Sequence, residues 1–237
     1  MRERTGSPPR LCTFMTRSEG VQNHVEVCGG GRHDGRMSHR AFSVEALLVV
    51  DVQSALVSGA GAVPEAERLV DRTAELIARA RRSGALVVHV QNDGPPGADD
   101  EPHTPGWELH HSVEAGPAEV VIRKTHDDGF EGTPLGRLLT DSGVRSLAVC
   151  GMMSEMCVQA TARTALARGY RVVLPHDAHA TRDIPAAPGI SERIPAAAVS
   201  RVAEWALGSD VEITAHAGDL TFTALPARPA EPAVRTA

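Results

Sequence analysis

The chain has 237 residues, of which 42% are hydrophobic and 23% are charged, and its formal net charge is −6. This length supports one α/β domain with a substantial core, or two small domains. The acidic balance argues against a nucleic-acid partner, and no apolar run approaches the roughly 18–20 residues that span a bilayer. Four cysteines in a chain of this length do not make a disulfide scaffold. We therefore expect a soluble cytoplasmic protein.

The two ends of the chain differ in composition from the middle. Residues 1–42 are rich in Gly and Arg, carry seven Arg against four acidic residues, and lack helical or strand periodicity. Too few apolar side chains are present there to offset the entropy of ordering, so we predict a disordered leader, unless translation starts at Met37. Residues 225–237 are rich in proline and predict a disordered tail. The folded domain is expected at residues 43–224.

Strand-like and helix-like segments alternate along this domain. Short apolar runs predict strands buried on both faces at residues 46–50, 85–90, 119–122, 146–150, 171–174 and 211–214. Apolar residues at helical spacing predict helices at residues 64–83, 135–139, 155–168 and 196–207. This alternation predicts right-handed crossovers and a doubly wound, three-layer αβα fold with a six-stranded, mostly parallel sheet.

Three chemically reactive side chains follow predicted strands. Asp51 ends the first strand, Lys124 follows the third, and Cys157 lies just beyond the fourth. Each has an ordinary explanation by itself: a capping Asp, a solvated Lys, and a Cys that serves as a small buried hydrophobe. Ligands of open parallel sheets bind beyond the carboxyl ends of the strands, so we expect the three side chains to converge there.

The order and setting of these residues resemble the isochorismatase-like cysteine hydrolases. The resemblance covers nearly the whole domain and rests on the segments ALLVVDVQ, VVIRKTHDDGFEGTPL, LAVCGMMSEMCVQATARTALARGY and VVLPHDAHAT. It implies a catalytic triad of Asp51, Lys124 and Cys157. It also implies a cis peptide bond between Met152 and Met153.

The chemistry of these residues is consistent with that resemblance. Ser154 is expected to cap the next helix and place Cys157 in its first turn, where the helix dipole and Lys124 would lower the pKa of the thiol below ~8.5. Asp51 would take the thiol proton and later return it to the leaving amine. The backbone N–H groups of Met153 and Cys157 are the candidate oxyanion hole. Attack on an amide carbonyl would give a thioester that water then hydrolyses.

Three further residues are candidates for substrate binding. Gln53 could hydrogen-bond the substrate amide, and Trp107 and Phe130 lie in loops where their rings could stack on substrate. Phe130 could equally fill the core. The second strand is not followed by the Asp-x-His metal motif that nicotinamidases of this superfamily carry, so we expect no metal and no cofactor.

Cys157 and the resemblance together favour a cysteine-dependent amidohydrolase. The expected reaction is hydrolysis of a C–N bond other than a peptide bond, in a small amide or lactam, through a thioester. The alternatives are an isochorismatase-type vinyl ether hydrolase, which needs no thiol, and a catalytically silent binding member. We expect a small-molecule amide substrate, no nucleic-acid or membrane partner, and a homo-oligomer, as is common in the superfamily.

Overall fold

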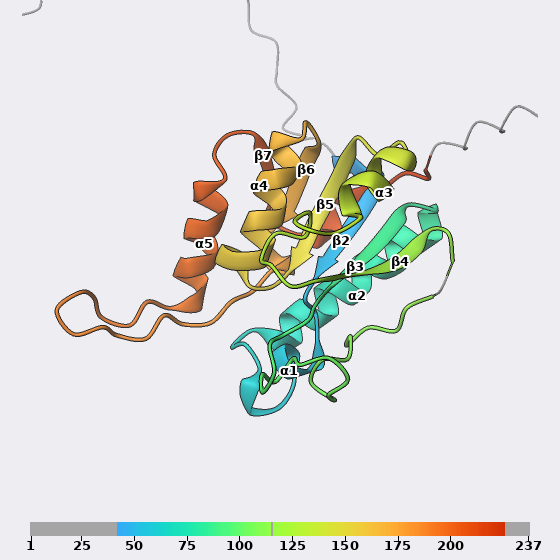
Figure 1. The fold of residues 1–237 in the computed structure, drawn as a ribbon. Coiled ribbons are helices and arrows are strands. Elements are labelled where there is room, and N and C mark those ends of the chain that lie inside the picture. The colour runs from blue at the N-terminus through green and yellow to red at the C-terminus, as the bar shows by residue number, and fades with distance from the viewer. Residues whose placement is uncertain (1–41, 115, 226–237) are drawn as a thin grey trace, which may run out of the picture. The chain divides into compact units, whose positions relative to one another are not determined.

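The computed structural model describes residues 42–114 and 116–225. Its main strands are β2 (Ala46–Val50), β3 (Leu86–Asn92), β4 (Glu119–Lys124), β5 (Ser146–Gly151), β6 (Arg171–Pro175) and β7 (Val211–Thr214). They form one six-stranded sheet in the order β4-β3-β2-β5-β6-β7, and every pairing in it is parallel (Figure 1). The six predicted strands and the doubly wound sheet are confirmed.

Helices connect these strands. They are α1 (Ser54–Val57), α2 (Ala66–Ser83), α3 (Leu135–Asp141), α4 (Gln159–Ala167) and α5 (Ala196–Ala206), with 3₁₀ turns at Gly59–Gly61, His176–Ala178 and Ala217–Asp219. The helix expected over residues 155–168 differs in detail, because a π-helical turn, Ser154–Val158, precedes α4. No helix in the described part of the chain combines the length and the apolar character needed to cross a bilayer.

The sheet separates two apolar clusters. Leu47 and Val49 of β2 belong to the cluster that contains Leu76 of α2, whereas Leu48 and Val50 belong to the cluster that contains residues of α3 and α4. All five residues of β2 are buried. This burial on both faces explains why the strand is a continuous apolar run rather than an alternating one.

A second, two-stranded parallel sheet lies outside the predicted domain plan. It pairs β1 (Phe42–Val44) with β8 (Leu220–Phe222). Three-residue strands are too short to show a period, so nothing in the sequence predicts them. Phe42 of β1 lies one residue before the predicted domain, and the N–H of Leu225, one residue after it, donates to the Gly84 carbonyl at 3.1 Å. The rest of the predicted leader and tail lies outside the described residues.

The strand order reverses beside β2. The chain runs from β2 to β3 and β4 on one side, and then continues from β5 to β6 and β7 on the other. The edge of the sheet beyond the carboxyl ends of β2 and β5 is thus the topological switch point, where doubly wound proteins bind ligands. Asp51 directly follows β2, and the segment that carries Cys157 directly follows β5.

Gly151 allows β5 to end tightly against β2. Its φ is 118°, and a Cβ built on it would lie 1.9 Å from the Val50 carbonyl oxygen. The next residue, Met152, donates its N–H to that same oxygen at 3.0 Å. Only glycine combines this backbone angle with this close approach.

We predict that Gly151→Ala destabilises the fold by about 3 kcal/mol or more, because the added methyl group meets backbone rather than a movable side chain. Gly169→Ala is the matched control. Gly169 also has a positive φ, 86°, but open space surrounds its Cβ position, so its cost is limited to about 1 kcal/mol. Urea unfolding of both variants measures the difference, and equal losses would contradict the argument.

Candidate active site

Three of the predicted site residues meet at the switch point. The Lys124 Nζ lies 2.8 Å from Asp51 Oδ2 and 3.4 Å from Cys157 Sγ. It also donates to Asn92 Oδ1 at 3.2 Å. Lys124 and Asp51 are 2% and 3% exposed, whereas Cys157 is half-buried. The buried ammonium group of Lys124 therefore contacts both the Asp51 carboxylate and the Cys157 thiol. Of these three side chains, only Cys157 is exposed enough for a ligand to reach readily.

The backbone places Asp51 and Lys124 at the switch point. Asp51 has a φ of 52°, in the left-handed region, and its N–H donates to the Val90 carbonyl at 2.8 Å. Asp tolerates this region better than most residues, and such conformations concentrate at functional sites. Lys124 is the last residue of β4, in register with Asn92 at the end of β3.

Contacts from distant segments hold the turn that carries Cys157. Ser154 was predicted to cap the helix, but its hydroxyl makes no capping bond. It lies 2.8 Å from His179 Nδ1 and 3.0 Å from Ser200 Oγ instead. The Ser154 N–H donates to the Ala180 carbonyl at 3.1 Å. The capping prediction was wrong because side chains distant in sequence claim this hydroxyl.

Protonation of the cluster also differs from the prediction. Burial and the Asp51 carboxylate raise the pKa of Cys157 above its ordinary value, and the Lys124 charge opposes them only in part. Burial likewise raises the pKa of Asp51, against the opposite effect of Lys124. Burial lowers the pKa of Lys124, but Asp51 and Cys157 more than reverse this, so its pKa is raised. These shifts favour a charged Lys124 beside a neutral thiol, not a preformed thiolate.

Two polar groups near the cluster are without hydrogen-bond partners among the described residues. The Met152–Met153 peptide bond is cis. Within the described residues, the Met153 N–H donates to no acceptor, and Asp51 Oδ1 is buried without a partner. An N–H donor and a carboxylate oxygen are thus both available to a bound molecule.

The three predicted substrate-binding residues have other partners. The Gln53 side chain is fully buried and bonds the backbone of Asn92 and Trp107, at 2.8–3.0 Å. Phe130 is 5% exposed and stacks on Tyr170, with ring centroids 6.4 Å apart. Trp107 donates its Nε1–H to Asp93 Oδ1 at 2.8 Å. Gln53 therefore ties the end of β3 to the loop that carries Trp107, and Phe130 fills the core.

Two acidic residues near the cluster were not predicted from the sequence. Asp127 Oδ1 lies 3.6 Å from Cys157 Sγ, and Asp100 accepts a hydrogen bond from the Asn92 amide at 2.7 Å. The neighbouring Asp128 accepts a bond from Thr164 of α4 at 2.7 Å, which ties this loop to the nucleophile helix. For Asp127, the signal available in the sequence was the acidic pair Asp127-Asp128, which begins three residues after Lys124.

A doubly wound sheet with a carboxylate, an ammonium group and a thiol at its switch point is the architecture of an α/β enzyme. The Isochorismatase domain family matches residues 45–199 of the chain. The chain belongs to this family and is a hydrolase.

Relatives extend this assignment. A streptothricin hydrolase from Streptomyces noursei is 70% identical over 187 residues, which cover 79% of this chain and 74% of that protein. The crystal structure of an isochorismatase from Pseudomonas putida KT2440 matches with a TM-score of 0.66 and 32% identity, over 74% of this chain and 90% of that one. N-carbamoylsarcosine amidase from Thermoplasma acidophilum matches with a TM-score of 0.58 and 27% identity, over 73% and 96%.

We predict that Asp127→Asn increases the rate at which iodoacetamide alkylates Cys157 at neutral pH. The Asp127 carboxylate raises the pKa of Cys157, so its removal increases the thiolate fraction. One charge at this distance is worth about 1 kcal/mol in a water-like environment. The gain is reduced in part because the thiolate of a more acidic thiol is less nucleophilic. The expected gain is about two- to fivefold.

The control for this experiment is Asp141→Asn, which removes a carboxylate from the exposed end of α3. Mass spectrometry of the peptide that contains Cys157 measures the rate in each variant. A slower reaction in Asp127→Asn than in the control would contradict the electrostatic argument.

Proposed function

We propose that this protein is a cysteine-dependent amidohydrolase that opens a C–N bond of a small amide or lactam through a thioester on Cys157. The observation that carries the proposal is the position of the Lys124 ammonium, 2.8 Å from the Asp51 carboxylate and 3.4 Å from the Cys157 sulfur. A buried cation that touches both an acid and a thiol stabilises a proton transfer between them.

The reaction begins when Asp51 accepts the thiol proton as Sγ attacks the substrate carbonyl carbon. The raised pKa of Asp51 suits it to this task. The backbone N–H groups of Met153 and Cys157 stabilise the oxyanion. The C–N bond then breaks, and the nitrogen leaves with the proton held by Asp51. Water, deprotonated by Asp51, cleaves the thioester and restores the thiol.

The relatives support the proposed substrate class. A protein 70% identical to this chain is named streptothricin hydrolase, and a structural neighbour is an amidase of N-carbamoylsarcosine. Both names describe hydrolysis, and the second describes cleavage of a C–N bond. We therefore assign this chain to the C–N hydrolases and propose streptothricin-like compounds with amide or lactam groups as substrates.

We propose that the protein acts in the cytoplasm and as a homo-oligomer. Cys150 and Cys157 are both free thiols, and a reducing compartment keeps a nucleophilic thiol active.

Val202 and Trp205 lie one turn apart on α5 and are 65% and 78% exposed. Large exposed apolar side chains suit a subunit interface. Light scattering of the purified chain measures the assembly.

We predict that Cys157→Ala lowers amide or lactam turnover by about 10⁴-fold or more, because no other group supplies the nucleophile. Circular dichroism and thermal unfolding should show an intact fold. The matched control is Cys150→Ala, which removes the buried thiol of β5 and should keep turnover. Mass spectrometry distinguishes the substrates: a lactam gains one water without loss of ammonia, whereas a primary carboxamide releases ammonia.

Two results would overturn the proposal in different ways. Turnover of a vinyl ether that survives in Cys157→Ala would identify an isochorismatase-type hydrolase. Failure of iodoacetamide to label Cys157, together with no turnover of any amide, lactam or vinyl ether tested, would identify a silent binding protein.

We predict an acid limb in the pH profile of kcat/KM. Asp51 must be ionised to accept the thiol proton, so the rate rises with pH through its pKa. Burial raises this pKa, and the midpoint should therefore lie above the ~3.9 of a free Asp. Rates measured from about pH 4 to pH 9 test this. Asp51→Asn should lose the limb together with most of the activity, and a flat wild-type profile would exclude Asp51 as the base.

A further inference from the structure

Two histidines and a glutamate form a cluster that the proposed reaction does not use. His176 Nδ1 lies 2.5 Å from Glu204 Oε1, and His179 Nε2 lies 3.0 Å from the same oxygen. One donor atom from each residue lies within 4.8 Å of the other two. We propose that His176, His179 and Glu204 form a binding site for a divalent transition metal ion of the zinc type.

The donor atoms suit such an ion. Imidazole nitrogens with one carboxylate oxygen are a common ligand set for zinc, and cobalt and nickel accept the same set. Arg201 Nη1 lies 3.1 Å from Glu204 Oε2, so it occupies one carboxylate oxygen and leaves Oε1 to the metal. A bound ion would replace the two imidazole hydrogen bonds that Oε1 now accepts.

A partner already positions the buried histidine. The other ring nitrogen of His179, Nδ1, lies 2.8 Å from Ser154 Oγ. On metal binding, Nδ1 would carry the ring proton and donate it to this hydroxyl, which leaves the Nε2 lone pair for the metal. Outer hydrogen bonds of this kind orient metal-binding histidines and fix their tautomer.

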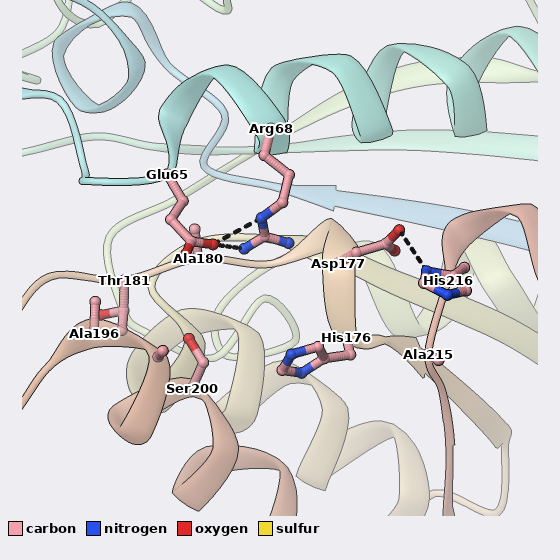
Figure 2. Close-up of a pocket in the computed structure, with 11 residues that line it drawn as sticks. Glu65, Arg68, His176, Asp177, Ala180, Thr181, Ala196, Ser200, Ala215 and His216 are labelled. Carbon is pink, nitrogen blue, oxygen red and sulfur yellow. Dashed lines mark hydrogen bonds and ion pairs between the residues drawn. The ribbon is translucent and has the colours of Figure 1, made fainter.

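A cavity gives the cluster a route to solvent. His176 has a side chain that is 49% exposed, and it lines a cavity of about 270 Å³. Figure 2 shows its ring on the same side of the cavity as Ser200, with Glu65 and Arg68 across from them. The lining hydroxyl of Thr181 is buried and lacks a hydrogen-bond partner among the described residues. The cavity can therefore hold the water molecules or the small anion that complete the coordination.

The site connects to the nucleophile segment. His179 pairs with Gly151 in a β-bridge, and the following Ala180 accepts the N–H of Ser154. Glu204 lies on α5, which packs against the π-helical turn. A metal bound here would link α5 to the segment after β6 and so support the turn that carries Cys157. It is separate from the reacting atoms.

The test uses the full metal-free chain and Zn²⁺ alone, measured by isothermal titration calorimetry. The wild type should bind one equivalent that His176→Ala loses, with affinity weakened at least roughly 100-fold, since even outer-shell partners of a metal are worth 10–100-fold. His216→Ala is the matched control. His216 lines the same cavity and has an exposed side chain, but it lies outside the cluster, so this variant should bind like the wild type.

Co²⁺ absorption identifies the ligands. A His–His–Glu site gives visible bands without the near-ultraviolet thiolate band that binding at Cys157 would add. Glu204→Gln supplies a second variant, and its folding is checked by circular dichroism. Equal Zn²⁺ affinity in the wild type and His176→Ala, or a thiolate band that accounts for all bound cobalt, would overturn the proposal without affecting the proposed hydrolase activity.

Discussion

The buried ion pair between Lys124 and Asp51 is the constraint around which the candidate site is organised. Removing two charges from water costs several kcal/mol per ion, and close contact with further hydrogen bonds must offset this. Lys124 offsets this cost through contacts with the Asp51 carboxylate, the Asn92 amide oxygen and the Cys157 sulfur. Its single positive charge is balanced whether the negative charge lies on Asp51 or on Cys157. A proton can therefore move between oxygen and sulfur without a change in the net charge of the cluster.

This arrangement depends on how two neighbouring strands end. Asp51, directly after β2, has a φ of 52°, and Gly151, the last residue of β5, has a φ of 118°, so the chain turns sharply after both strands at the same edge of the sheet. Asp51 follows one of these strands, and the π-helical turn that carries Cys157 follows the other. The raised pKa of Cys157 fits this geometry, because the thiol lies among apolar and acidic neighbours. The proposed base and the proposed nucleophile thus depend on each other, and the thiol is not ionised in advance.

The sequence predicted the features that depend on local patterns. The main strands are buried on both faces, so their apolar composition was enough to predict them. Asp51, Lys124 and Cys157 follow strands whose carboxyl ends lie at one edge of the sheet, so their proximity could also be predicted. It missed what depends on distant partners. Ser154 has the composition of a helix cap, but His179 and Ser200 bind its hydroxyl. Gln53 has the position of a substrate ligand, but neighbouring backbone occupies its amide. Burial of Cys157, which no local pattern reports, reversed the expected direction of its pKa.

The long connection between β3 and β4 passes the end of β2, and main-chain hydrogen bonds attach it to the segment that follows β2. His110 donates to Val52, and Ser54 and Ala55 donate to Glu108 and Gly106, at 2.9 Å. Bonds between peptide groups make few demands on side-chain identity. Insertions and substitutions in this stretch can therefore accumulate during evolution while the attachment persists. A lineage could reshape this stretch beside the candidate site without disturbing Asp51, Lys124 and Cys157.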